Sequence, residues 1–270
     1  MLEILEDTSE IKKFLVDNIA KLEKEKCFDQ HINPINYEGS IPVDEKFDFI
    51  KKGFKNYCKK VYYNIILFKL KKEAQKMFRI KVVGKTNVKK IKNKSAIITC
   101  NHFNKLDSFA VKSAFGNNIW TISGDYNNFK GFVGNIARNT GLLPLSEKLS
   151  VKKNFANGLK YHLTHKHRVL IYPERAMWWN YSKPRPLLIG AFHWAVQNNV
   201  PVVPTFVTFE DSGKKDKDNY AEYYWTINVL EPIFPNQNLS PKERMEDMRQ
   251  KNYNAWKVCY EKTYNKKLEY

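Results

Sequence analysis

Short, almost wholly apolar runs recur through the middle of the chain, and single amphipathic segments separate them. The clearest are SAIITC at residues 95–100, RVLIY at 168–172 and VPVVPTFVTF at 200–209. A strand that is apolar on both faces must be covered on both sides, which is typical of parallel strands in a layered sheet. The sequence therefore predicts the α/β class, with a layered mixed sheet flanked by helices.

Apolar runs and helical spacing together predict the order of the elements. Strands are expected at 79–84, 95–100, 118–122, 141–145, 168–172, 201–208 and 223–230. Helices are expected between them at 107–116, 128–139, 150–165 and 187–198, and a long amphipathic helix at 241–264 closes the chain. The segment DSGKKDKDN at 211–219 predicts an exposed hairpin-type loop.

The first part of the chain has a different pattern. Residues 9–26 have helical apolar spacing with Ser9 as a candidate N-cap, and a linker rich in Asn, Pro and Gly follows at 31–45. Residues 47–78 predict one long or broken basic helix. We therefore divide the chain into a helical, basic N-terminal extension at 1–78, which we expect to associate with membranes, and an α/β domain at 79–270.

Charge is unevenly distributed within the net +18. Residues 51–94 hold sixteen Lys or Arg and one acid, whereas residues 1–50 hold six bases and twelve acids. A cluster of this density predicts a polyanionic partner, either nucleic acid or an anionic membrane surface. Aromatic residues among the lysines of 47–78 favour an interfacial helix in a headgroup layer.

The four cysteines are far apart and have no metal-binding spacing, so we expect free thiols in a reducing compartment. The N-terminus lacks a basic region followed by an apolar one, and no run approaches about 18 apolar residues. We expect a cytoplasmic protein without a transmembrane helix, a metal or a bound cofactor.

The stretch ITCNHFNKLD at 98–107 carries the clearest chemical signal. It places His102 at the carboxyl end of a predicted strand, where ligands bind in open α/β sheets, and Asp107 at the start of the next helix. A carboxylate on one ring nitrogen fixes the tautomer and raises the basicity of the other, which can then deprotonate a hydroxyl. The bare spacing also occurs by chance, as a surface histidine beside a helix cap.

Two further segments end strands with polar or proline residues. Residues 169–175, VLIYPER, place Glu174 at the same sheet edge as His102, although a strand-terminating Pro-Glu turn is common. Residues 199–204, NVPVVP, predict by themselves only the start of a strand bounded by prolines, with no catalytic or binding role. There is no Ser or Cys in a nucleophile-elbow context, and Cys100 is expected in the core. Direct attack by a substrate hydroxyl therefore suits the chain better than a covalent intermediate.

Taken together in this order, the segments resemble the glycerolipid acyltransferase family, which includes the 1-acylglycerol-3-phosphate acyltransferases. The resemblance covers about residues 80–232. The family's Asn-His-x4-Asp block matches Asn101, His102 and Asp107, and its Gly-x-x-Pro block matches residues 141–145. Its Phe-Pro-Glu-Gly-Thr-Arg block matches only 172–174, and its Val-Pro-x-x-Pro block matches 200–204.

The departures concern the acceptor. The family's second-block arginine falls near Glu147, and the Gly-Thr-Arg of its third block is replaced by residues 175–177, Arg-Ala-Met. In the family those groups hold the acceptor's phosphate. The candidate replacements here are Arg175, Lys183 and Arg185, which could also be solvated loop residues. Trp178, Trp179 and Tyr181 could line an acyl groove, lie at a bilayer or pack in the core.

The resemblance implies acyl transfer from an activated carrier to the free hydroxyl of a lysophospholipid, with 1-acylglycerol-3-phosphate as the preferred acceptor in phospholipid biosynthesis. His102 would be the base and Asp107 its partner, and we assign substrate binding to Asn101, Glu174, Arg175, Lys183 and Arg185. Expected partners are acyl-CoA or acyl carrier protein as donor, the lysophospholipid, and the anionic inner face of the cell membrane. No nucleic acid is expected. The rivals are a basic nucleic-acid-binding protein and a non-catalytic lipid-binding relative.

Overall fold

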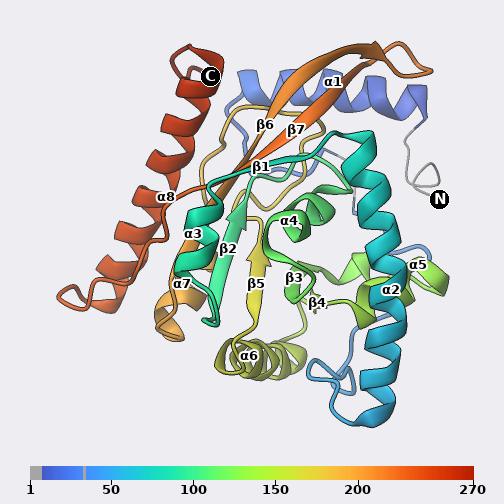
Figure 1. The fold of residues 1–270 in the computed structure, drawn as a ribbon, viewed down its shortest axis with the longest axis vertical. Helices are drawn as coiled ribbons and strands as arrows, with labels where there is room; N and C mark the ends of the chain where they lie inside the picture. Colours follow the sequence, from blue (N-terminus) through green and yellow to red (C-terminus); the bar gives the residue numbers. More distant parts are fainter. Residues whose placement is uncertain (1–7, 33–34) are drawn as a thin grey trace.

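A seven-stranded mixed sheet forms the centre of the computed structural model, which describes residues 8–32 and 35–270 (Figure 1). The strand order is β1-β7-β6-β2-β5-β3-β4, and every neighbouring pair is parallel except β6 and β7. This confirms the predicted fold class. The strands are β1 (Lys81–Val83), β2 (Ala96–Cys100), β3 (Ile119–Gly124), β4 (Leu142–Leu145), β5 (Arg168–Ile171), β6 (Val202–Lys215) and β7 (Ala221–Val229).

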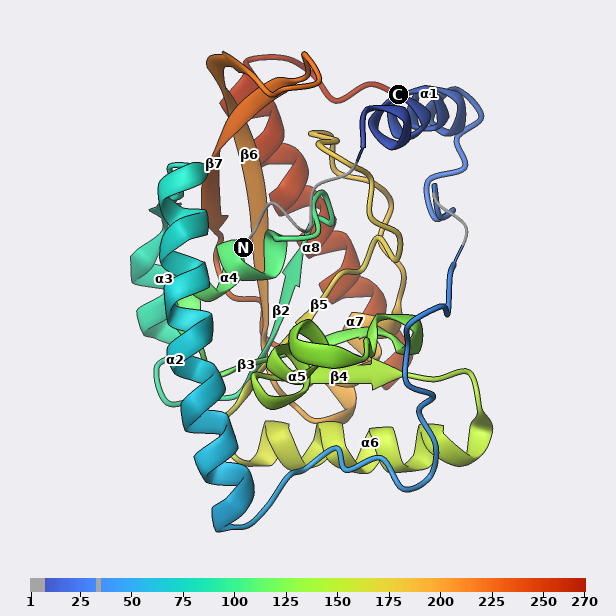
Figure 2. The same cartoon turned by 90° about the vertical axis from the view of Figure 1, so that its right-hand side faces the viewer.

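Helices cover both faces of the sheet (Figure 2). They are α1 (Ser9–Lys24), α2 (Phe54–Met77), α3 (Lys85–Lys90), α4 (Asp107–Phe115), α5 (Gly131–Asn139), α6 (Leu149–Thr164), α7 (Gly190–Gln197) and α8 (Pro241–Tyr264). Side chains of α2, α4 and α5 pack on one core and those of α6, α7 and α8 on the other. β2 supplies both cores, because Ile97 faces one and Ile98 the other. Its Cys100 is fully buried, as predicted.

The expected N-cap, Ser9, is instead the first residue of α1, and the Thr8 side chain caps that helix. Most other predicted boundaries agree to within three residues, but two differ by more. The expected helix at 47–78 begins only at Phe54, since Gly53 has a φ of +94° and Asp48 accepts the backbone N–H groups of Ile50 and Lys51 in a turn. The expected loop at 211–219 is partly strand, because β6 continues to Lys215. The remaining tight turn is held by Asp216, whose carboxylate accepts two backbone N–H groups. The short helix α3 was not predicted.

The N-terminal helix α1 lies across the loop that follows β5 (Figure 1). The contact is an apolar cluster of Leu15, Phe28, Ile32, Ala176 and Trp178. Lys12 is 5 % exposed and donates to both Asp216 and Asp218 at 2.6 Å, which ties α1 to the β6–β7 hairpin. Trp178 is thus part of a core. Among residues 8–32 and 35–270, no helix combines the length and the apolar character needed to cross a membrane.

Candidate active site

His102 and Asp107 form a contact just beyond the carboxyl end of β2. The Nδ1 of His102 lies 2.6 Å from Oδ2 of Asp107. The Asp107 side chain is 3 % exposed and the His102 side chain 24 %, so the imidazole is reachable and the carboxylate is shielded. Because an ionised carboxylate only accepts hydrogen bonds, Nδ1 carries the proton and Nε2 remains an acceptor. The two side chains are in the contact that the sequence predicted. The role of His102 as a general base stays a prediction.

The chain after β2 is shaped by local hydrogen bonds that bring the dyad together. Asn104 accepts the backbone N–H of Leu106 on its side chain, at 3.0 Å, and so turns the chain into α4. Asp107 is the first residue of that helix, where the free N–H groups favour a carboxylate. The Asx turn at residues 104–106 leads directly into the helix and so returns Asp107 to the side of His102.

Tyr172 is a third member of this group that the sequence matched but did not assign. Its hydroxyl donates to Oδ1 of Asp107 at 2.5 Å, and its ring stacks on the His102 ring at a centroid separation of 4.0 Å. Burial and the Asp107 charge raise the pKa of Tyr172, so the phenol stays protonated and donates. Asp107 is held between two side chains that both donate to it.

Asn101 and Glu174 contact the backbone around the dyad. The Asn101 amide donates to the carbonyl of Val207 at 3.1 Å and accepts its N–H at 2.8 Å, which fixes the end of β2 against β6. Glu174 accepts the backbone N–H of His102 at 3.0 Å and that of Arg185 at 2.8 Å. Both side chains are at most 2 % exposed. In this geometry they hold the backbone of the dyad, and the substrate-binding role expected for them stays a prediction.

Arg185 lies behind the site, in contact with Glu174. Its Nη2 is 2.9 Å from Oε2 of Glu174, and its guanidinium also donates to the carbonyls of Phe28 and Ala176. The side chain is 1 % exposed and packs over the Trp178 ring. An ion pair buried this completely braces the loop. The Nε–H of Arg185 has no hydrogen-bond partner among the described residues, but it is buried too, so a phosphate at the surface does not reach it.

The other two predicted cations differ from each other. Lys183 pairs with Glu23 of α1. Arg175 is exposed and has a φ of +68°, a left-handed conformation that favours glycine. It occupies the position of the glycine in the family's third block, so the backbone keeps the turn while a guanidinium is added.

His31 and Tyr126 complete the surroundings of Arg175. Burial lowers the pKa of His31, and the charges of Arg175, His102 and Arg185 lower it further. Burial also raises the pKa of Tyr126, whose ring lies edge-on to that of His31. Neither residue was predicted. His31 comes from the linker before α2, about seventy positions from the dyad in the printed sequence, and no local motif marks it.

The Gly-x-x-Pro block at residues 141–145 forms β4, an edge strand of the sheet. Gly141 has a φ of +118°, and a Cβ there would lie 2.3 Å from the carbonyl oxygen of Ile119. Only glycine therefore lets β4 start this close to β3. Within the described part of the chain, no group of three or more His, Cys, Asp or Glu side chains is arranged to hold a metal ion.

Comparisons with known proteins agree with this geometry. The acyltransferase family model matches residues 79–208. The fold is similar to that of the 1-acyl-sn-glycerophosphate (LPA) acyltransferase PlsC from Thermotoga maritima, with a TM-score of 0.57 and 16 % identity over 81 % of this chain and 86 % of that one. No curated protein has a significant sequence match.

The matched range contains the dyad, Tyr172, Glu174 and Arg185. The motifs, the sheet order and the family match thus point to one conclusion. Residues 79–208 match the acyltransferase family, and the fold of the chain is similar to that of an acyltransferase.

Proposed function

We propose that this acyltransferase moves a fatty acyl group from a thioester carrier to the free hydroxyl of a lysophospholipid, with 1-acylglycerol-3-phosphate as the preferred acceptor. The observation that carries the proposal is the His102–Asp107 contact of 2.6 Å at the carboxyl end of β2. It supplies a general base, and among the described residues no serine or cysteine hydrogen-bonds to either ring nitrogen of His102. Acyl transfer without an enzyme-bound intermediate is the chemistry that such a base supports.

In the proposed reaction, Nε2 of His102 removes the proton from the acceptor hydroxyl. The oxygen attacks the thioester carbonyl, and the tetrahedral intermediate collapses by expelling the carrier thiolate, which takes the proton back from the imidazolium. Asp107 stabilises the imidazolium, and Tyr172 holds Asp107 in place. Glu174 and Arg185 keep the backbone of His102 fixed, so the base does not have to be ordered when substrate binds.

The acceptor phosphate is proposed to bind Arg175. Three observations support this. The side chain is exposed, its charge and that of His102 both act on His31 and lower the pKa of that residue, and it replaces a family glycine at a strained φ of +68°. A non-glycine residue in that region costs about 1–2 kcal/mol, and such strain is typical of functional sites. Lys183 is a secondary candidate because it would have to leave Glu23 first.

The donor is proposed to be acyl-CoA or acyl carrier protein on the cytoplasmic side of the membrane. The decisive experiment incubates purified protein with labelled acyl-CoA or acyl carrier protein and a panel of lysolipids, with products identified by mass spectrometry. Diacylated product that forms only with an intact His102 supports the proposal. Hydrolysis of the thioester without acyl transfer, or no reaction with any lysolipid, contradicts it.

A further inference from the structure

Helix α2 is apolar on two opposite faces, and only one of them has a partner. The inner face supplies Leu67, Leu70 and Ala74 to the core. The outer face carries an apolar stripe of residues spaced three or four apart, which are 43–82 % exposed: Phe54, Tyr57, Val61, Ile65 and Phe68. A contiguous exposed stripe of this size on a folded domain indicates an interaction surface.

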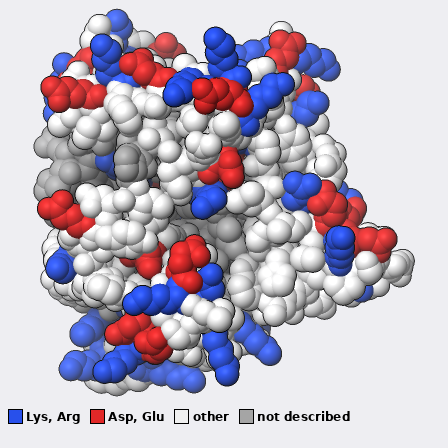
Figure 3. All heavy atoms as spheres, turned by 180° about the vertical axis from the view of Figure 1, so that it is seen from behind, with Lys and Arg blue, Asp and Glu red and all other residues white. Residues whose placement is uncertain are grey.

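Lysines flank the apolar stripe. α2 contains seven lysines and a single acid, Glu73. Among the described residues, none of these lysines forms an ion pair with an acidic side chain. Seen from behind, Lys and Arg also form the outer edge at the end of the molecule where α2 begins, with some acidic residues beside them (Figure 3). The stripe is thus apolar in the middle and cationic at its margins.

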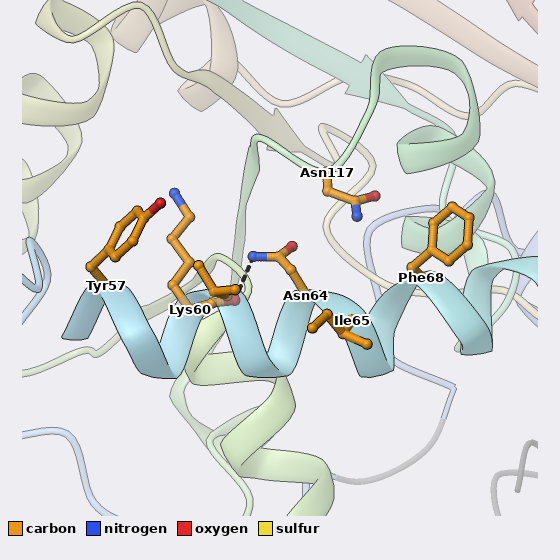
Figure 4. A pocket seen from close by; sticks show the side chains of 7 residues that line it. Tyr57, Lys60, Asn64, Ile65, Phe68 and Asn117 are labelled. Atoms are coloured by element: carbon orange, nitrogen blue, oxygen red, sulfur yellow. Dashed lines mark hydrogen bonds between the residues drawn. The ribbon is translucent and has the colours of Figure 1, made fainter. Parts of the chain in front are cut away.

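A groove runs along one margin of the stripe (Figure 4). It has a volume of about 480 Å³ and is lined by four of the five stripe residues together with Lys60, Asn64 and Asn117. Lys71 donates to the Asn117 side chain at 2.9 Å, and the fully buried Lys112 donates to the carbonyl of Thr140 at 2.9 Å. Burial, with Lys60 and Lys71 nearby, lowers the pKa of Lys112 to about 7. The cations here repel one another, and an anion would relieve that repulsion.

We propose that the outer face of α2 docks on an anionic lipid bilayer, with the apolar stripe inserted at the interface and a lipid headgroup phosphate in the groove at Lys60. The occupant is a bilayer because the stripe is apolar along its whole length, and its flanking charges are all basic apart from Glu73. A nucleic acid would use the lysines but leave Phe54, Ile65 and Phe68 exposed. This surface is separate from the acceptor site proposed at Arg175, since the groove residues come from α2 and the turn after α4.

The test is vesicle co-sedimentation of the full chain on phosphatidylcholine vesicles with and without phosphatidylglycerol. The charge variant combines Lys69→Glu, Lys72→Glu and Lys76→Glu, all exposed on α2. The matched control combines Lys242→Glu, Lys262→Glu and Lys267→Glu, exposed on or just after α8 at the other side of the molecule (Figure 1). The stripe variant is Ile65→Ser with Phe68→Ser. Circular dichroism confirms that each variant is folded.

We expect the unmodified chain to bind only the anionic vesicles and to be released by salt. The charge variant should partition at least about 100-fold more weakly, because each lysine near an anionic surface strengthens binding about fivefold and three lysines are lost. The control should lose much less. The stripe variant should also bind weakly. Equal loss in both charge variants, or a stripe variant that binds normally, overturns the docking site. So does a stripe variant that converts a dimer to a monomer in sedimentation, since the stripe would then join two copies.

The acyl-transfer activity separates this proposal from the catalytic one. With a short-chain lysolipid dispersed as monomers, the α2 charge variant should turn over like the unmodified protein. With acceptor embedded in anionic vesicles it should be slow. Loss of transfer on both forms of acceptor by a folded variant contradicts a pure docking role, whereas absence of transfer in the unmodified chain bears only on the proposed function.

Discussion

Two histidine-containing groups lie at opposite ends of β5, and the partners of their histidines differ. At the carboxyl end of β5, Tyr172 joins His102 and Asp107. At its amino end, His167 contacts His162, with 3.0 Å between the two Nδ1 atoms. The Nε2–H of His162 donates to the carbonyl of Phe49 at 2.8 Å, and the ring stacks on Trp120.

The comparison shows what a carboxylate adds to an imidazole. His162 is fully buried with only neutral partners, and burial lowers the pKa of His162 and His167 to about 4. Two neutral rings then act as donor and acceptor to one another and tie α6 to the linker before α2. His102 instead has a buried anion to stabilise its charged form and a partly open ring. The His162–His167 pair is a structural link, and the His102–Asp107 pair is equipped to move a proton.

The largest effect on turnover should follow His102→Ala. Removing the base should lower the rate of acyl transfer about 10²–10⁴-fold while the protein stays folded, because general-base catalysis contributes that much. The matched substitution is His167→Asn at the other pair, which should leave turnover close to normal. A His102→Ala protein with near-normal transfer, measured by product mass spectrometry, would show that the dyad is not the catalytic centre.

Arg175→Gly should come next, and it acts on the acceptor alone. Losing a charged hydrogen bond should raise the acceptor KM for lysophosphatidate about 10–150-fold, with the donor KM unchanged. Because glycine suits the φ of +68°, the free energy of unfolding should rise by about 1 kcal/mol. Lys183→Met serves as the comparison. If KM is unchanged in both variants, the acceptor phosphate binds elsewhere.

Tyr172→Phe should have a smaller effect on turnover. It restores the family's residue and removes only the hydroxyl that donates to Asp107. One neutral donor on a carboxylate corresponds to a decrease in kcat of about 2–12-fold. The acid limb of the pH–rate profile should also move to higher pH, because Asp107 then directs more of its charge to His102. A profile that only decreases in height, without this shift, would assign Tyr172 to packing.

The smallest effect on turnover, and a clear one on stability, belongs to the His162–His167 pair. Both have pKa values near 4 when folded, against an ordinary value of 6.5, so the unfolded chain binds more protons between these limits. The free energy of unfolding should therefore fall as pH drops from about 6.5 toward 4. Urea denaturation at several pH values measures this. His167→Asn should make the dependence shallower, and an unchanged slope would mean that other groups cause it.

The sequence predicts well what depends on local pattern. The apolar runs located all seven strands, and amphipathic spacing placed the last helix at its observed ends, 241–264. In the structure a capping box of Ser240 and Glu243 fixes the start of that helix. The short α3 has the sequence KTNVKK, which has no apolar period, and was missed. The helix start at Phe54 depends on the positive φ of Gly53, and a positive φ cannot be read from a basic run.

The site was predictable to the same extent. His102 and Asp107 lie within one turn of each other in sequence, so their contact followed from local geometry. Glu174 and Arg185 were expected to bind substrate, and their burial was not foreseen, because the burial of a loop under α1 depends on residues far away such as Phe28. For the same reason His31 was missed. Long-range closure decides which of several equivalent cations stays free, and in the described structure Arg175 is the exposed one.

The tie between α1 and the hairpin has a consequence for the order of folding. Lys12 pairs with residues 204 and 206 positions later, and Lys183 pairs with Glu23 from 160 positions away. A chain made from its N-terminus releases α1 first, yet the surfaces that hold it are synthesised last. Closing so long a loop has a high entropy cost until the β6–β7 hairpin exists. We therefore expect α1 to dock last, so that the loop bracing His102 becomes rigid only when synthesis is complete.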